Sequence, residues 1–435
     1  MLENTFKSLY KAPSHLHWAL ANSGLDNLVM GSPLEASKFG RQGRLVRRLV
    51  GVACILGIPR FAVALVACLE VARLMYQSRG VQAERLPTTC RILVGFGAGP
   101  EKQMWQEFEA ESGDPAICLD EVRTETFLVY HRPRTCELFQ HIWRASTVAV
   151  PFLLNTTLEP VASNRKNTIT YAALRMGKYI MYRTWWQEIE QSSISQVVFL
   201  SCSTPGFACI DAGMEAVEFR QHGLHWKSVL MPAFSTLKMI TQVEADWYRQ
   251  FLPQSKIEVE RVSRRVTDHT PRVLIASVYD THEAAKKQDL VRVQSLVRWA
   301  KQNNLRVIIR KHPRETDNFW PTYFPDLEID TSQDLFEEAM MRIAPMFVVS
   351  WFSTALVDAL LANIVAVSIM QATDSRFSNL VFEIPKHCLL WPTAESVMTA
   401  LVNGHADVAS CVSELQKARM DHSLPAASKK TNRIG

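Results

Sequence analysis

The sequence predicts an α/β protein with two doubly wound, Rossmann-like domains that follow a helical region. Short apolar runs alternate with helical stretches up to about residue 263, and the alternation restarts after the polar, proline-ended segment 263–271. The length of 435 residues agrees, because it allows two or three domains that each bury a core. We therefore expect a helical region at 1–88, α/β domains at 89–263 and 272–415, and a disordered basic tail at 416–435.

The N-terminal region contains a strongly apolar segment at residues 45–76. A membrane-spanning helix needs about 20 uninterrupted apolar residues, and Pro59 and Arg60 interrupt this segment in its middle. We therefore predict two helices. They either pack within the N-terminal region or contact an anionic membrane surface through the arginines at the front of the segment, which are Arg41, Arg44, Arg47 and Arg48.

The first α/β domain is predicted from short apolar runs that end in turns or lead into helices. The run from residue 91 passes through a glycine-rich turn into a helix. Residues 116–121, 215–223 and 256–262 are further predicted strands, and 196–213 and 236–252 each contain a strand followed by a helix. Such an alternation is typical of a parallel sheet with helices on both faces.

The same pattern returns in the second domain. Residues 272–277, 305–310, 346–350 and 364–369 are predicted strands. Helices are predicted at 289–302, where the apolar residues have helical spacing, and at 354–362, which ends at Asn363. This is a second doubly wound unit.

Composition limits the classes of binding partner and the cellular compartment that we expect. The net charge of +5 suits a phosphorylated ligand or an anionic membrane, but it is too small to indicate nucleic acid. Nine scattered cysteines form no Cys-x-x-Cys pair, which argues against a zinc site and a disulfide framework. Together with the lack of a secretion-signal pattern, this predicts a cytoplasmic protein, with the inner face of the cytoplasmic membrane as its contact if residues 45–76 bind lipid.

A ligand site is predicted at the carboxyl ends of two strands of the second domain, where ligands bind in open α/β sheets. Basic residues follow strand 305–310 and would donate to a phosphate; they are Arg310, Lys311, His312 and Arg314. Ser350, Ser353 and Thr354 follow strand 346–350 and begin a helix, whose N-terminal amides favour an anion. Taken alone, the hydroxyls are also explained as helix caps, and His312 as a loop histidine.

These residues carry a resemblance. His312-Pro313 and Ser353-Thr354 resemble the motif pair of bacterial capsule and lipopolysaccharide glycosyltransferases of the GT-B fold, in the group of sialyltransferases, polysialyltransferases and Kdo transferases. The resemblance covers about residues 195–370. It implies two domains facing across a cleft, with a nucleotide-sugar donor on the C-terminal domain and a glycan or glycolipid acceptor on the N-terminal one. Teichoic-acid glycerophosphotransferases show a similar pair, so the motifs specify the donor phosphate better than the donor.

The acceptor side departs from that group, which has an acidic catalytic triplet at a strand end. Gln221-His222-Gly223 stands at the corresponding position. The resemblance then implies that His222 is the general base, with Glu218 on the same strand as the carboxylate alternative or the group that orients it. Asp211 is a third candidate. Gly223 and Gly97 are expected either to let the acceptor approach the backbone closely or to form tight turns. Gln221-His222-Gly223 is also explained as a turn that ends the strand.

No Asp-x-Asp pair ends an apolar strand; residues 326–330, "DLEID", come nearest and look like a solvated loop. We therefore expect transfer without a metal or other cofactor, with basic residues stabilising the leaving phosphate. The expected donor is a CMP-activated acidic sugar such as Kdo or sialic acid. The alternatives are a CDP-polyol phosphotransferase of the teichoic-acid type and a non-catalytic scaffold in capsule assembly.

Overall fold

The structure is a computed structural model, and it describes most of the chain. Three predicted site residues, Gly97, His222 and Arg314, lie outside the described residues, as does most of the predicted basic tail. The described residues are 9–21, 40–82, 84–96, 100–111, 113–121, 123–158, 165–189, 191–221, 223–225, 227, 229–259, 265–278, 287, 289–312, 315, 318–332, 334–351, 353–371 and 380–417.

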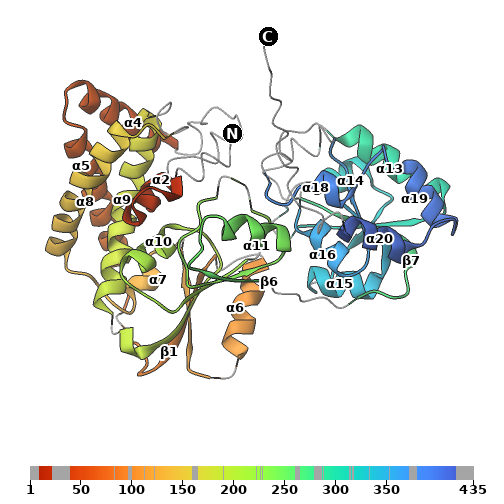
Figure 1. The fold of residues 1–435 in the computed structure, drawn as a ribbon, viewed down its shortest axis with the longest axis horizontal. Helices are drawn as coiled ribbons and strands as arrows, with labels where there is room; N and C mark the ends of the chain where they lie inside the picture. The colour runs from red at the N-terminus through yellow and green to blue at the C-terminus, as the bar shows by residue number, and fades with distance from the viewer. Residues whose placement is uncertain are drawn as a thin grey trace, which may run out of the picture. The chain divides into compact units, whose positions relative to one another are not determined.

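The chain forms two compact units, which are coloured from red to green and from green to blue in Figure 1. Unit 1 comprises Met1–Glu260 and Asn379–Val381, and unit 2 comprises Arg261–Ser378 and Phe382–Gly435. Each unit contains one six-stranded sheet in which every pairing is parallel. The predicted fold class of two doubly wound α/β units is therefore confirmed.

The sheet of unit 1 has the strand order β2-β1-β3-β4-β5-β6. All six strands were predicted, and their bounds are β1 (Cys90–Gly95), β2 (Ala116–Asp120), β3 (Ile194–Phe199), β4 (Val217–Arg220), β5 (Thr236–Met239) and β6 (Lys256–Val259). The connecting helices include α6 (Pro100–Ala110), α10 (Thr204–Asp211) and α11 (Gln242–Arg249). β1 is buried at every residue, as expected for a central parallel strand that is covered on both faces.

Alternate residues of the central strands pack on opposite sides of this sheet. Leu93 and Val198 pack against Phe108 of α6. Ile92 and Phe199 belong instead to the large core that includes side chains of α9 and α10. Because side chains alternate along each strand, both faces of the sheet are covered by apolar packing. The polar side chains considered below lie at the strand ends.

Within the described residues, six helices belong to the helical part of unit 1, and they are not continuous in sequence. The predicted pair is α4 (Gly40–Ile55) and α5 (Pro59–Gln77), with Pro59 at the first helical position, where a missing N–H costs nothing. The others are α2 (His17–Ala21), preceded by the 3₁₀ turn η1 (Ser14–Leu16), α7 (Glu125–Leu128), α8 (Thr135–Asn155) and α9 (Arg165–Glu188). Another 3₁₀ turn, η4 (Gln191–Ser193), leads into β3.

The long helices α8 and α9 stand between β2 and β3 in sequence but pack with α4 and α5, as Figure 1 shows. Gly177 permits the close approach of α9 to α5, because a Cβ at this position would lie 2.7 Å from the carbonyl oxygen of Ala67. Among the described residues, no helix combines the length and the apolarity needed to cross a membrane.

The sheet of unit 2 has the order β12-β11-β10-β7-β8-β9. The four predicted strands are β7 (Thr270–Ala276), β8 (Arg306–Arg310), β10 (Pro345–Ser350) and β11 (Val365–Ser368). The helices are α13 (Leu290–Gln302), α14 (Phe319–Tyr323), α15 (Phe336–Ile343), α16 (Ala355–Leu361), α18 (Ile384–His387), α19 (Glu395–Val402) and α20 (Val408–Lys417). Asn363 has a φ of 64°, which ends α16 where the sequence predicts it.

Two edge strands were not predicted. β9 (Glu328–Asp330) pairs with β8, and β12 (Leu389–Leu390) pairs with β11. The interpretation of residues 326–330 as a solvated loop was therefore wrong for Glu328–Asp330. Backbone pairing with β8 holds this acidic segment in the sheet although its side chains have little apolar surface.

Candidate functional site

The strand order of unit 2 defines where a ligand would bind. From β7 the chain moves outward through β8 to β9, and then returns to β10 on the other side of β7. The connections after β7 and β10 therefore diverge at the carboxyl edge of the sheet, which is where open α/β sheets form a ligand crevice. The loop after β8 lies at the same edge, on the other side of β7. His312 and the Ser353-Thr354 pair thus follow strands that flank the same central strand.

The three predicted hydroxyl residues after β10 have different roles in the structure. Ser350 is fully buried and donates to the carbonyl oxygen of Ala276 at 2.8 Å, so it fastens the end of β10 to the end of β7. Ser353 is half-buried, and its Oγ accepts from the N–H of Ala355 at 3.2 Å. Thr354 occupies the N-cap position of α16, but its side chain forms no capping hydrogen bond. Capping therefore accounts for Ser353 but not for Thr354.

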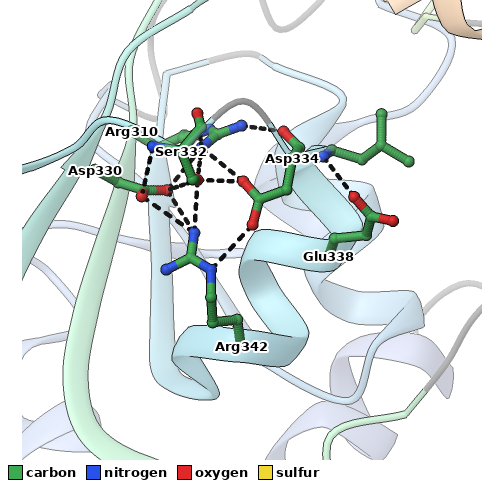
Figure 2. Close-up of polar contacts among 7 residues, drawn as sticks. Arg310, Asp330, Ser332, Asp334, Glu338 and Arg342 are labelled. Atoms are coloured by element: carbon green, nitrogen blue, oxygen red, sulfur yellow. Dashed lines mark hydrogen bonds and ion pairs between the residues drawn. The ribbon is translucent and has the colours of Figure 1, made fainter.

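Arg310 lies inside a compact ionic network at the end of β8 (Figure 2). Its Nη1 is 2.7 Å from Asp330 Oδ2 and 3.0 Å from Asp334 Oδ1, and it donates to Ser332 Oγ at 2.6 Å. Arg342 approaches the same carboxylates, with its Nη2 3.0 Å from Asp330 Oδ2 and its Nε 2.9 Å from Asp334 Oδ2. Burial acts to raise the pKa of Asp330, but hydrogen bonds from Ser332 and Arg310 outweigh it and leave the pKa below its usual value.

This network bears on the prediction that Arg310 binds a donor phosphate. The guanidinium already contacts two carboxylates, and its side chain is only 14% exposed. Asp330 and Asp334 compensate the positive charges of Arg310 and Arg342, which makes the network a brace between β8, β9 and α15. Its contacts therefore assign Arg310 to holding the strand end.

Lys311 and His312 follow β8 in a turn that Glu315 closes. The N–H of His312 donates to Glu315 Oε2 at 3.1 Å, and the N–H of Glu315 donates back to the carbonyl oxygen of His312 at 2.8 Å. Glu315 is buried, whereas Lys311 and His312 are half-buried. The reciprocal bonds fix the backbone from which both basic side chains extend. Pro313 and Arg314 lie outside the described residues.

Two tryptophans, which sequence reasoning did not single out, hold the loops at this edge. Trp351 follows β10 and donates from Nε1 to Asp289 Oδ2 at 3.1 Å. Trp320 donates from Nε1 to Ser277 Oγ, just after β7, at 2.8 Å. Asp289 is buried and also pairs with Arg292. The indole donors thus position the connections after β7 and β10.

Unit 1 has its own switch point, between β1 and β3, and a buried carboxylate lies there. Glu121 follows β2, and its Oε2 accepts from the hydroxyls of Ser201 and Ser203, which follow β3. Burial raises the pKa of Glu121 above its usual value, although both serine bonds oppose the shift. Sequence reasoning missed this cluster. The signal was an acidic residue at one strand end and a hydroxyl-rich turn, "SCSTP", at another.

The glycine-rich turn after β1 is described only at its start. Gly95 leaves room for the carboxylate of Glu101, since a Cβ at this position would lie 2.5 Å from Glu101 Oε2. The same oxygen accepts from the N–H of Phe96, and Glu101 is buried. The tight packing explains the glycine at residue 95. The predicted role of Gly97 remains a prediction.

Gln221 and Gly223 belong to a buried polar cluster at the end of β4. Gln221 is 6% exposed, and its Nε2 donates at 2.7 Å both to Gly223 O and to Glu244 Oε1. Glu244 is fully buried on α11 and also accepts from the N–H of His225 at 2.9 Å and from Thr241 Oγ1 at 2.8 Å. Glu244, which the sequence did not reveal, therefore fixes both sides of the loop that contains residue 222.

Glu218 is paired with cations on one face of the sheet. Its Oε1 lies 2.5 Å from Arg220 Nε and 3.1 Å from Lys238 Nζ, and Arg220 also pairs with Glu111 at 3.0 Å. Glu218 Oε1 is therefore occupied by two ion pairs, and these contacts do not favour Glu218 as a general base. Asp211 lies at the end of α10 and accepts from Tyr179 Oη at 2.6 Å.

No protein-family model matches the chain, and no curated protein sequence matches it. Solved structures with a partly similar course include the UDP-GlcNAc 2-epimerase of Methanocaldococcus jannaschii, with a TM-score of 0.39, 9% identity and coverage of 76% of this chain and 99% of the other. The wall teichoic acid polymerase TagF has a TM-score of 0.40 and 7% identity, with coverage of 82% of this chain and 91% of the other. The O-GlcNAc transferase of Thermobaculum terrenum has a TM-score of 0.34 and 11% identity, with coverage of 94% of this chain and 80% of the other. Similarities this low carry no argument, and the fold assignment rests on the two parallel sheets.

Proposed function

We propose that the chain is a nucleotide-sugar-dependent glycosyltransferase whose donor binds at the carboxyl edge of the unit 2 sheet. The observation that carries the proposal is the position of Thr354 and of the Lys311-His312 turn on strands that flank β7. A hydroxyl without a capping bond and two basic side chains on a fixed turn are groups that bind a diphosphate or a phosphodiester.

Within this proposal, three of the predicted donor residues contact the donor and three support them. Lys311 and His312 donate to the phosphate, and the hydroxyl of Thr354 donates to the same group. Ser350 keeps β10 and β7 together, Ser353 caps α16, and Arg310 braces the end of β8 through the network of Figure 2. Positioning of this kind keeps the site close to the geometry that transfer requires.

A CMP-activated acidic sugar is the proposed donor, and a surface polysaccharide or lipid-linked glycan is the proposed acceptor. The sequence resemblance of His312-Pro313 and Ser353-Thr354 supports this choice. His222 is the proposed general base, because the locked cluster of Gln221 and Glu244 holds the two neighbouring loop positions and the base must be held in place. Metal-independent transfer stays part of the proposal, with Lys311 and His312 stabilising the leaving phosphate.

A screen of thermal stability against CMP, CDP, UDP, GDP and their sugars tests the proposal. A ligand that binds only the folded protein raises its melting temperature. At a ligand concentration of 100 times the Kd, the free energy of unfolding increases by about 2.7 kcal/mol. We expect CMP and a CMP-sugar to stabilise the protein most. Stabilisation by CDP and a CDP-polyol would assign the polyol phosphotransferase alternative, and no response to any nucleotide would contradict a donor site.

We also propose that unit 1 binds an anionic bilayer surface through α4 and α5. Ile55 is 86% exposed and Phe61 56%, and Arg47 and Arg48 are exposed on the same helical pair. Replacing Arg47 and Arg48 with Gln should weaken binding to anionic vesicles by about 1 kcal/mol for each arginine. Equal sedimentation of the variant and the wild type with such vesicles would contradict this contact.

A further inference from the structure

A cavity of about 350 Å³ lies in the helical part of unit 1, and none of the residues discussed as donor or acceptor groups lines it. Its walls come from η1, α2, α8 and α9. A volume of this size accommodates a ligand such as a phosphorylated sugar or a lipid headgroup. The side chains that decide its chemistry are His15, Trp18, His141, Arg144, Tyr179 and Arg183.

Basic groups dominate the polar lining of this cavity. Two arginines, Arg144 and Arg183, and two histidines, His15 and His141, face it, and no carboxylate is among the lining residues. The nearby acid is Asp211, which accepts from the hydroxyl of Tyr179 at 2.6 Å. Burial raises the pKa of Asp211 despite the opposing effects of Tyr179, Arg183 and His15.

Arg183 is half-buried and lacks the partners that arginines usually have in such a position, whereas Arg144 is exposed. Across the described ranges, the buried Nε of Arg183 has no hydrogen-bond partner, and no carboxylate lies within ion-pair distance of Arg144 or Arg183. A buried donor without an acceptor is unfavourable and rare in folded proteins. An anionic oxygen in the cavity would satisfy it.

Apart from Gln187, the remaining walls are apolar, and they continue onto an exposed apolar surface. Leu16, Ala145 and Ala149 line the cavity, and so does Val148, which is 48% exposed. Trp143, next to Arg144 in α8, is 44% exposed and stacks at a tilt on Phe61 of α5, with ring centroids 5.3 Å apart. A ligand here would place its anionic group against the arginines and an apolar part along α8.

We propose that this cavity is a binding site for a phosphate ester, with Arg144 and Arg183 as the phosphate ligands. A guanidinium forms paired hydrogen bonds with phosphate oxygens, and both arginines have that capacity available. The phosphate belongs either to a lipid headgroup or to a soluble phosphorylated molecule. The site does not depend on the proposed transferase function, since none of its residues takes part in the donor or acceptor contacts.

Calorimetric titration of the full-length protein tests the proposal with three probes: inorganic phosphate, glycerol 3-phosphate and a short-chain phosphatidic acid. The central variant is Arg144→Gln, because Arg144 is exposed and its replacement leaves the core intact. Arg134→Gln is the matched control, since Arg134 lies at the N-cap of the same helix with its side chain 80% exposed. Arg183→Gln and Arg183→Lys separate the charge of Arg183 from its forked geometry.

We expect at least one probe to bind the wild type, and Arg144→Gln to weaken that binding about tenfold or more. Arg134→Gln should bind the probes as the wild type does. Arg183→Lys should lose less affinity than Arg183→Gln loses. Preference for phosphatidic acid identifies a lipid source, and equal binding of glycerol 3-phosphate identifies a soluble one. Failure of all three probes to bind, or equal losses in Arg144→Gln and Arg134→Gln, would overturn the proposal.

Discussion

The carboxyl edges of the two sheets differ in the polar groups that they present. At the edge of unit 1, the polar groups at the strand ends include buried carboxylates, Glu121 and Glu244, that accept bonds from serines, an amide and a backbone N–H. At the edge of unit 2, Thr354 and the Lys311-His312 turn present a hydroxyl and basic groups. The groups proposed to contact the donor at the edge of unit 2 are thus a hydroxyl and basic side chains, whereas Glu121 and Glu244 at the edge of unit 1 accept hydrogen bonds.

This difference suggests a division of labour within the proposed reaction. In the proposal, the nucleotide phosphate binds the basic side chains and the hydroxyl at the edge of unit 2. An acceptor hydroxyl needs a proton acceptor, and the polar residues at the edge of unit 1 are of that kind. Variants at each edge should therefore affect different steps.

The largest expected effect is on turnover at the edge of unit 1. His222→Ala should lower kcat by roughly 10²–10⁴, because a general base contributes about that much, while the affinity for nucleotide stays unchanged. Steady-state kinetics and nucleotide titration measure the two quantities. The wild-type rate should rise with pH through an imidazole-like pKa, and the variant should lose this limb. Full activity of His222→Ala would remove the base from residue 222.

The next effect is on stability. Glu244→Ala should lower the free energy of unfolding by about 3 kcal/mol, because it leaves buried donors of Gln221, Thr241 and His225 without their acceptor. Urea unfolding measures it. Glu258→Ala is the control, since the side chain of Glu258 is 41% exposed and pairs at the surface with Lys256. Similar midpoints for both variants would mean that the Glu244 cluster does not hold the loop.

A smaller effect is expected on nucleotide affinity at the edge of unit 2. His312→Ala should weaken binding by about 1.5–3 kcal/mol, the usual range for a hydrogen bond to a charged group. Because His312 is half-buried in a turn that Glu315 closes through backbone contacts, the fold should persist. Unchanged affinity in the variant would remove His312 from the donor site.

The smallest effect is a change in the pH dependence of stability. The pKa of Glu121 is higher in the folded protein than its usual 4.5, so the folded protein holds this proton more tightly than the unfolded one. The resulting stability is complete below pH 4.5 and is lost as pH rises through the raised pKa. Glu121→Gln keeps the shape without the charge, so its stability relative to wild type should increase towards neutral pH. A difference in free energy of unfolding between Glu121→Gln and the wild type that stays constant from acidic to neutral pH would contradict a buried, destabilised carboxylate.

The central strands were predictable because each is a continuous apolar run that ends in a turn or leads into a helix. β9 was not, because two of its three residues are acidic and the strand exists through its pairing with β8. The insertion of α8 and α9 into the bundle of α4 and α5 was also not predicted, since local sequence does not show which helices pack together.

The candidate site was predictable only in part, for a related reason. The sequence places His312 and Thr354 at strand ends, which depends on local pattern alone. It does not show that Arg310 pairs with Asp330 and Asp334, residues 20 and 24 positions away. Nor does it show that Glu244 on α11 is buried, because a glutamate in the first turn of a helix is usually a solvated residue.

Calorimetric titration of CMP into the wild type and into the double variant Ser353→Ala/Thr354→Ala tests the central claim most directly. Thr354 forms no capping bond and Ser353 forms a single one, so the double variant should lose about 1 kcal/mol of stability or less. If Thr354 binds the donor phosphate, the double variant should lose about 1.5–3 kcal/mol of binding free energy for CMP, which is more than its loss of stability. A donor site at this edge predicts saturable binding by the wild type and a clear loss in the variant. Equal affinities, or no binding by the wild type, would contradict it.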